Sequence, residues 1–254
     1  NEEANKLSQI YPRVKLIKNK KNLGFCLANN QGIKKALNSK ADFVLLLNND
    51  TVVKSNFLTI LIDYAQKNNF QGILTPKILY YKSDKIWAMG GQFSFITSIP
   101  RMIGQGKPSA KYNKVFEPDY ASGCALLINR KVLNKVGYLD NIYFAYYEDT
   151  DLSFRVKKAG YKIKVIPKSV IWHKVSQSTK QNRGKIGELQ SYLHAKNGLI
   201  FGNKNLFGLK KVIYIINQIL VKYPLFIILK CDGAKARSEY KRGIFEGIKT
   251  LFTI

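Results

Sequence analysis

The sequence predicts an α/β protein, because apolar strand-like runs alternate with segments of helical periodicity along most of the chain. The run "ADFVLLLNND", residues 41–50, is continuously apolar and ends in polar residues. This pattern is typical of a strand that is buried on both faces of a parallel sheet. The next segment, "SNFLTILIDYAQKN" at 55–68, has the spacing of a helix. We therefore expect a mainly parallel sheet flanked by helices.

The other elements follow the same alternation. Residues 14–19, "VKLIKN", are expected to form a short strand, and "NLGFCLANNQGIKKALN" at 22–38 a helix with glycines near its start. Further strands are expected at residues 72–79, 90–95, 121–129 and 161–167, and short helices at 130–136 and 150–159.

The character of the chain changes near residue 183, which divides it into a predicted catalytic domain, 1–182, and a helical C-terminal region, 183–254. Within the second part, the apolar run 212–229 approaches the roughly 20 residues that span a bilayer. A charge, two amides and a proline interrupt its middle, which a spanning helix tolerates badly. We expect 206–254 to bind a membrane surface through this run and its basic flanks, "KK" and "KARSEYKR". The alternative is helices packed on the catalytic domain or on a partner subunit.

The composition limits the partners and the chemistry. Forty-two Lys and Arg face 16 Asp and Glu, and this excess favours an anionic partner such as nucleic acid, anionic lipid or a phosphorylated substrate. Nucleic acid is disfavoured, because no helix-turn-helix, zinc or RNA-recognition signature is found. Three widely spaced cysteines fit a reducing compartment. With two histidines in all, a metal would rest mainly on carboxylates, which suit Mg²⁺ or Mn²⁺.

Acidic residues are scarce, yet Glu148, Asp149 and Asp151 fall within four positions of "YFAYYEDTDLSFRVKKAGY". Neighbouring carboxylates raise one another's pKa, so their clustering indicates a functional site. A second interpretation is a helix N-terminus, where acids complement the helix dipole. Both interpretations fit these residues together, and Arg155 is placed to pair with Asp151 one turn along.

Two further candidates follow predicted strands. "NND", Asn48 to Asp50, lies at the carboxyl end of a strand, where open α/β sheets bind ligands, so Asp50 is placed to hold a divalent cation. The alternative is a turn, which Asn and Asp both favour. His173 follows the strand "VIW" and is either a structural histidine or an imidazole ligand beside carboxylates.

The motifs together resemble family 2 glycosyltransferases, in particular the rhamnosyltransferase-like branch. The resemblance covers roughly residues 14–205 and depends on five segments in the family's order. These are "NLGFCLANNQGI", "LLLNNDT", "YASGCALLINRKVLNKVGYLD", "YFAYYEDTDLSFRVKKAGYKIKVIP" and "WHKVSQS".

The resemblance implies a GT-A fold and roles for individual residues. Asp50 matches the metal-binding acid and His173 a histidine that completes the metal shell. In the same "NND" motif, Asn48 replaces an acid and is expected to bond sugar or ribose, with Asn49 beside it at the donor. Asp149 matches the catalytic base, which Glu148 and Asp151 would tune or help to orient on the acceptor.

The resemblance also implies a donor site. Its predicted residues are Asn22, Gly24, Asn29, Asn30, Ser122 and Gly123. For Gly123, a tight contact between strands is an equal alternative.

The function implied is an inverting transfer of rhamnose or a similar hexose. The sugar moves from a nucleotide-sugar donor to a saccharide or lipid-linked acceptor in cell-surface polysaccharide synthesis, with Mg²⁺ or Mn²⁺. We expect a cytoplasmic enzyme at the inner face of the membrane. By comparison with the family, the first strand and the nucleotide-gripping loop are missing before "NEEANKL", so the domain is expected to be N-terminally incomplete. The alternative is a non-catalytic relative that only binds partners.

Overall fold

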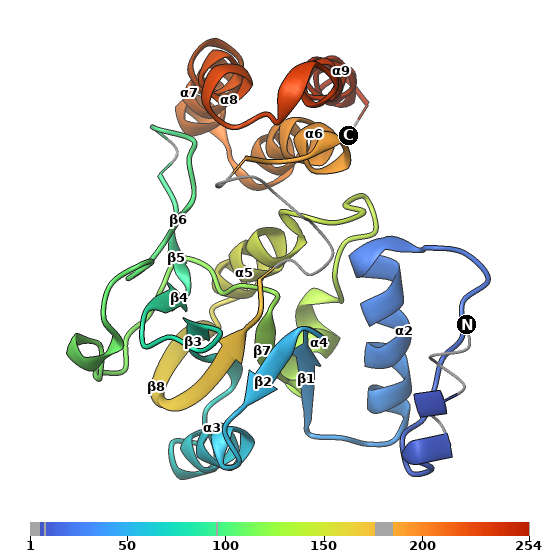
Figure 1. Cartoon of the computed structure of the whole chain (residues 1–254), viewed down its shortest axis with the longest axis vertical. Helices are drawn as coiled ribbons and strands as arrows, with labels where there is room; N and C mark the ends of the chain where they lie inside the picture. Colours follow the sequence, from blue (N-terminus) through green and yellow to red (C-terminus); the bar gives the residue numbers. More distant parts are fainter. Residues whose placement is uncertain (1–5, 8, 95, 176–184, 254) are drawn as a thin grey trace.

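A computed structural model describes residues 6–7, 9–94, 96–175 and 185–253. A central sheet has helices on both faces, and the helices of the C-terminal part, α6 to α9, lie together at one end of the molecule (Figure 1). The α/β prediction is therefore confirmed. Residues 176–178 of the "WHKVSQS" motif and the predicted boundary at 182/183 lie outside the described residues.

The main sheet is mixed, and the prediction of a mainly parallel sheet is wrong. Its strands run in the order β1 (Phe43–Leu47), β7 (Ala125–Asn129), β3 (Gly72–Tyr80), β8 (Lys162–His173) and β2 (Thr51–Val53), with β4 (Ile86–Ala88) on β3. In the described ranges, β3 and β8 are the one parallel pair. Because β7 is antiparallel to both its neighbours, β1, β3 and β8 still point the same way.

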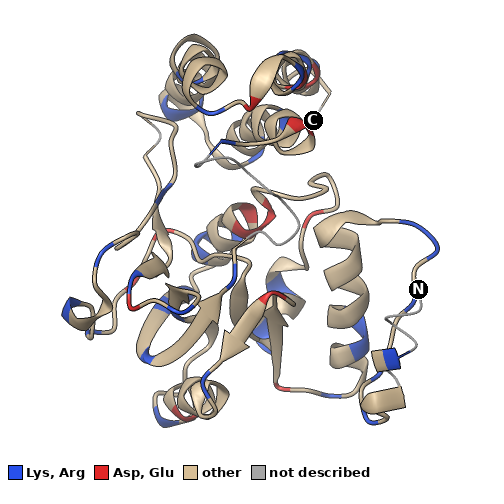
Figure 2. Cartoon of the chain, in the orientation of Figure 1, with Lys and Arg blue, Asp and Glu red and all other residues tan. Residues whose placement is uncertain are grey.

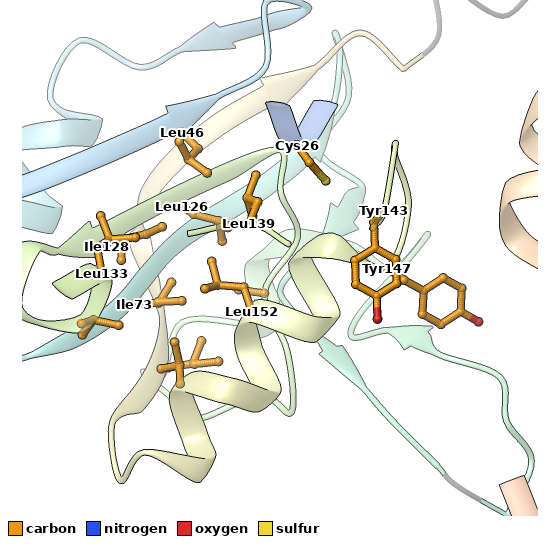
Figure 3. Close-up of a cluster of buried hydrophobic side chains, with 14 of the residues drawn as sticks. Cys26, Leu46, Ile73, Leu126, Ile128, Leu133, Leu139, Tyr143, Tyr147 and Leu152 are labelled. Atoms are coloured by element: carbon orange, nitrogen blue, oxygen red, sulfur yellow. The ribbon is translucent and has the colours of Figure 1, made fainter. Parts of the chain in front are cut away.

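Both faces of the sheet are covered, which explains the continuous apolar strands. Alternate residues of β7 face opposite ways: Leu126 and Ile128 join a cluster with α2 (Gly24–Asn38) and α5 (Glu148–Lys158), part of which Figure 3 shows. Leu127 joins a second cluster on the other face, with α3 (Phe57–Lys67). The helix predicted at 130–136 is confirmed as α4 (Arg130–Val136).

Two strand predictions fail. Residues 14–19 form no strand, and their apolar side chains, such as Val14, are exposed, because none of the described strands pairs with them. Of the described residues in 90–94, two form β5 (Gly91–Gln92), which pairs with β6 (Arg101–Met102), and residue 95 lies outside the described ranges. The short 3₁₀ turn Ser109–Lys111 follows β6.

The C-terminal part is helical, as predicted. It contains α6 (Glu188–Asn205), α7 (Gly208–Asn217), a π-helical segment (Gln218–Lys222), α8 (Tyr223–Leu229) and α9 (Gly233–Thr250). Helices α6 and α9 approach closely, since a Cβ atom at Gly243 would lie 2.4 Å from the Tyr192 carbonyl oxygen. Whether these helices form a separate domain stays a prediction.

Candidate functional site

Asp50 and His173 lie side by side because of how β2 pairs with β8. Thr51 is opposite His173 in this antiparallel pair, so the preceding residue, Asp50, reaches the imidazole. Asp50 Oδ1 and His173 Nε2 are 3.0 Å apart. The Lys174 amide donates to the Asp50 carbonyl over 2.9 Å and extends the antiparallel pairing by one residue. Two residues 123 positions apart in sequence thus form one pair.

The Asp50–His173 pair fits a divalent cation. The 3.0 Å contact is not aligned as a hydrogen bond: Asp50 Oδ1 and His173 Nδ1 are both buried without a hydrogen-bond partner among the described residues. Burial lowers the pKa of His173, against the opposing effect of Asp50, so the imidazole is neutral at pH 7 with a lone pair to share. Two ligand atoms at right angles, each about 2.1 Å from one ion, are themselves about 3 Å apart.

Two side chains alone cannot complete the coordination of such an ion. Within the described ranges, no group of three or more His, Cys, Asp or Glu residues could hold a metal. The remaining ligands would come from a bound anion and water, as Mg²⁺ sites commonly arrange. The ring of Trp87 lies edge-on to His173, with centroids 4.3 Å apart, and fixes the imidazole plane.

The rest of "NND" forms the turn at the end of β1. The Asn48 amide donates to the Cys124 carbonyl over 3.0 Å, and Thr51 Oγ1 donates to the Asn48 carbonyl over 2.7 Å. Asn49 is exposed and Asn48 is half-buried. The turn interpretation is therefore correct for the backbone, while the donor roles of both side chains stay predictions.

Glu148 and Asp149 begin α5, and the acidic first turn of this helix is red in Figure 2. Asp149 Oδ2 accepts from the Gly123 amide over 2.8 Å, and Oδ1 accepts from the Thr150 amide over 2.6 Å. Glu148 is buried, and its Oε2 has no partner in the described part of the chain.

The two carboxyl groups hold protons to unusually high pH. Burial, reinforced by the neighbouring Asp149, raises the pKa of Glu148 to about 8. Burial also raises the pKa of Asp149, although the hydrogen bonds from Gly123 and Thr150 oppose this. A carboxylate whose pKa lies nearer neutrality is a stronger base and is suited to accept a proton from a hydroxyl.

The turn that precedes these acids is strained, a feature that sequence reasoning missed. Tyr146 and Tyr147 have φ angles of 66° and 74°, in the left-handed region that costs non-glycine residues about 1–3 kcal/mol each. Asn197 Nδ2 on α6 donates to the Ala145 and Tyr146 carbonyls over 2.8 and 2.9 Å. No glycine marks this turn in "YFAYYED", so the sequence carries no signal for it.

Residues 122–124 connect the two acid sites. Gly123 donates its amide to Asp149, and the next residue, Cys124, accepts from Asn48. A Cβ atom at Gly123 would lie 3.3 Å from the Phe25 ring and 3.5 Å from Asp149 Cβ, so a small residue is favoured. Ser122 is buried, and its hydroxyl accepts from the Cys124 amide at 3.3 Å. The close contacts of Gly123 are therefore with helices α2 and α5 and not with a strand, and the donor roles of Ser122 and Gly123 stay predictions.

The start of α2 packs against the acid-bearing loop. Asn22 Oδ1 accepts from the Gly24 amide over 2.9 Å, and Gly24 has a φ of 76°. A Cβ atom there would lie 2.5 Å from the Phe144 carbonyl oxygen, so only glycine fits. The Phe25 amide donates to that same carbonyl over 2.7 Å. Asn22 and Gly24 therefore lie next to the loop that carries the acids.

Asn30 and Asn29 differ from each other. Asn30 is buried and is bonded on both ends of its amide: Nδ2 donates to the Leu139 carbonyl at 2.8 Å, and Oδ1 accepts from the Leu139 amide at 3.1 Å. Asn29 Nδ2 donates to the Phe25 carbonyl within its own helix. The contacts of Asn30 are those of a residue that holds the loop at Leu139.

Asp151 is also fully bonded within the protein. Its carboxylate accepts from Arg155 Nε at 2.7 Å, the pair expected from the sequence, and from Asn205 Nδ2 at 2.9 Å. Arg155 in turn donates to the Val136 and Tyr138 carbonyls. These contacts favour a positioning role for Asp151 over contact with an acceptor.

With this geometry in view, comparison with known proteins decides the family. The family model described as "Glycosyl transferase family 2" matches residues 1–137, more than half of the chain. The chain belongs to glycosyl transferase family 2. The resemblance drawn from the motifs is confirmed.

Curated relatives of this family 2 glycosyltransferase are distant. It is 27% identical over 192 residues to N-acetylglucosaminyl-diphospho-decaprenol L-rhamnosyltransferase of Mycobacterium tuberculosis. This alignment covers 67% of this chain and 62% of that protein. It is 26% identical over 147 residues to the low-salt glycan biosynthesis hexosyltransferase Agl10 of Haloferax volcanii, which covers 56% and 46%. The chain thus spans about half to three-fifths of these relatives' lengths.

Solved structures confirm the GT-A-like fold. GalNAc-T7 with UDP, GalNAc and Mn²⁺ matches with a TM-score of 0.55 at 15% identity, over 89% of this chain and 47% of that one. The mannosyltransferase PcManGT of Pyrobaculum calidifontis, with GDP-Man and Mn²⁺, matches with a TM-score of 0.51 at 11% identity, over 98% and 62%.

Asn30→Ala is predicted to lower the free energy of unfolding by about 2–4 kcal/mol, because it removes buried hydrogen bonds and leaves Leu139 unsatisfied. Asn29→Ala is the matched control and should cost less. Urea denaturation measures both. Near-normal stability of Asn30→Ala, together with lost binding of UDP or GDP, would show that Asn30 is a donor residue instead.

Glu148→Gln is predicted to flatten the dependence of stability on pH. An unfolded glutamate loses its proton near pH 4.5, whereas native Glu148 keeps it to about pH 8. The native state therefore binds more protons between these values, and the free energy of unfolding falls as pH rises through that window. Urea denaturation at pH 5 and pH 8 should show a smaller fall in the free energy of unfolding for Glu148→Gln than for the wild type. The exposed control Glu188→Gln should show the same fall as the wild type.

Proposed function

We propose that this family 2 protein is an inverting glycosyltransferase that moves rhamnose or a similar hexose from a nucleoside-diphosphate sugar to a saccharide or lipid-linked acceptor. The observation that carries the proposal is the bridge at residues 122–124. It ties the cation-competent pair, Asp50 and His173, to the base candidate Asp149. Sugar transfer requires that the site for the donor diphosphate and the base for the acceptor hydroxyl lie about one sugar's length apart.

In the proposed reaction, Asp149 accepts the proton of the acceptor hydroxyl. The hydroxyl oxygen forms a bond to the anomeric carbon from one side while the bond to the donor diphosphate breaks on the other. The electron pair leaves with the diphosphate, and the anomeric configuration inverts. Below about pH 8, Glu148 is protonated and places no full negative charge beside Asp149. Above that pH, the ionised Glu148 carboxylate makes Asp149 a stronger base.

A divalent cation at Asp50 and His173 would neutralise charge on the diphosphate. The Mn²⁺ bound with UDP in GalNAc-T7 and with GDP-Man in PcManGT supports Mg²⁺ or Mn²⁺ here. The names of the curated relatives support rhamnose or another hexose as the donor sugar and, in one, a lipid-diphosphate acceptor. A role in cell-surface polysaccharide synthesis agrees with those names. The three buried cysteines are all free, which agrees with a cytoplasmic location.

We further propose that the helix from α7 to α8 binds the inner membrane surface. In the described ranges, Gly208–Leu229 is the one helix whose length and composition would allow it to cross a membrane. Its outward residues are strongly apolar: Leu209, Leu220 and Ile228 are 73%, 70% and 67% exposed.

Three polar residues in the middle of this helix bond the protein instead, while Lys210 near its start is exposed. Asn217 Nδ2 donates to the Ile96 carbonyl at 2.7 Å, Gln218 Nε2 to the Ser98 carbonyl at 3.2 Å, and buried Lys222 to the Tyr147 hydroxyl at 2.7 Å. A helix whose middle is bonded inward by polar residues and whose outer face is mostly apolar favours lipid on that outer face. Because its middle is bonded to the catalytic part, a position along the membrane surface agrees better with these contacts than a crossing.

Asp149→Asn is predicted to lower turnover about 100-fold or more while preserving donor binding, since it removes the base and keeps the shape. The assay measures nucleoside diphosphate release from rhamnose, mannose and N-acetylgalactosamine donors with Mn²⁺ and an acceptor. Asp63→Asn, at an exposed position of α3, is the control and should be unaffected.

Near-normal turnover of Asp149→Asn would refute its role as the base. If the full-length wild type binds no donor with Mn²⁺, the protein is a non-catalytic relative and the proposed function is wrong.

The double variant Leu209→Asp with Leu220→Asp is predicted to reduce binding to phosphatidylglycerol vesicles about tenfold or more. Two charges would replace exposed apolar side chains that lipid would bury. Flotation at low salt measures the bound fraction. Val115→Asp, at an exposed apolar residue outside the helix, is the control. A wild type that stays unbound and elutes as a dimer would show that a partner subunit covers this face instead.

A further inference from the structure

We propose that Lys222 is a positioning residue: it holds the strained turn that carries Glu148 and Asp149, and so links the exposed apolar helix to the base. This inference rests on the proposed function, because it assigns Asp149 as the base. It adds a mechanical connection between the surface that would meet lipid and the atoms that would react.

The burial of Lys222 calls for a functional explanation. The residue is 1% exposed, and its Nζ donates to Tyr147 Oη over 2.7 Å. The rings of Tyr147 and Phe226 lie 5.3 and 5.2 Å from Nζ. None of the described carboxylates forms an ion pair with it. Burying an unpaired ammonium costs free energy that a methionine of similar length would not, so this lysine is not explained by packing alone.

The partner of Lys222 is the residue on which the geometry of the acids depends. Tyr147 is the residue directly before Glu148, and its carbonyl accepts the Asp151 amide over 2.8 Å in the first turn of α5. Its φ of 74° sets the direction in which α5 begins. In Figure 3, Tyr147 and Tyr143 extend from this end of α5 away from the aliphatic cluster. A change at Tyr147 would therefore turn Glu148 and Asp149.

The strained turn is held from outside by the C-terminal helices. Asn197 bonds the carbonyls of Ala145 and Tyr146, and the His194 ring stacks on Tyr146 with centroids 4.6 Å apart. Lys222 adds a contact from a different helix, at the end of its π-helical segment. Such segments often occur at functional sites. Strained residues persist only when their surroundings hold them, and here α6 and the helix at Lys222 do so.

The same helix presents opposite faces to lipid and to the turn. Leu220, two residues before Lys222, is 70% exposed, whereas Lys222 reaches the Tyr147 hydroxyl. Seating the apolar face on a surface would restrain the helix that carries the ammonium. Binding of the helix to a lipid surface would therefore make the acid-bearing turn more ordered.

The test uses the full-length protein as Lys222→Met, Tyr147→Phe and the double variant. Lys230→Met is the matched control at an exposed position of the same region. Hydrogen exchange without ligand should be faster about tenfold or more at residues 143–149 in both single variants, and unchanged in β3 and β8, because a charge-assisted hydrogen bond is lost. Exchange at residues 143–149 in the double variant should be no faster than in either single variant.

In the donor assay, turnover should fall about tenfold for both single variants, with the donor KM within about twofold and the melting temperature preserved. Phosphatidylglycerol vesicles should slow exchange at 143–149 in the wild type and in Lys230→Met, and not in Lys222→Met. Unchanged exchange at 143–149 in Lys222→Met, or additive effects in the double variant, would overturn the proposal.

Two further results separate this inference from the proposed function. Vesicles that protect 208–229 in the wild type without slowing exchange at 143–149 would overturn the link to lipid. A wild type that transfers no sugar would refute the proposed function, while the exchange data would still decide whether Lys222 holds the turn.

Discussion

The site depends on two hydrogen bonds made by consecutive residues, the Gly123 amide to Asp149 and the Asn48 amide to the Cys124 carbonyl. The first fixes a helix start and the second fixes a strand end, so one short segment sets the spacing of the acids. Because β7 follows directly and lies between β1 and β3, the sheet holds this segment rigidly. The antiparallel direction of β7 is what brings its first residues to the edge where β1 ends.

The C-terminal helices have an unusual distribution of polarity, and it has one physical explanation. On the inner side of the helix, half-buried Asn217, buried Gln218 and buried Lys222 bond carbonyls and a hydroxyl of the protein, whereas leucine and isoleucine face outward. The inward bonds satisfy groups that would be costly in an apolar core. The outward residues remain costly in water, so an apolar environment for that face would remove the remaining penalty. The polar residues that interrupt the apolar run in the sequence are therefore its attachment points.

The sequence predicted the parts of the fold and site that depend on local pattern. Periodicity predicted β1, α3 and α5, and Asp50 and His173, which were expected to meet, lie side by side, while their role at a metal stays a prediction. The strand direction of β7 could not be predicted, because an apolar run does not tell which neighbour it pairs with. The expected strand at 14–19 has the right residue types and no partner strand in the described ranges. The role of Asn30 could not be predicted from the sequence either. The motif indicated that its side chain binds the donor, whereas in the structure it bonds the carbonyl and the amide of Leu139.

A crystal structure with Mn²⁺ and a non-hydrolysable nucleoside-diphosphate sugar would show directly whether Asp50, His173 and Asp149 belong to one transfer site. We expect an anomalous manganese peak within about 2.0–2.6 Å of Asp50 and His173, in contact with the diphosphate. We also expect the anomeric carbon of the sugar to face the Asp149 carboxylate. A manganese peak away from the Asp50–His173 pair, or a sugar whose anomeric carbon points away from Asp149, would contradict a shared transfer site.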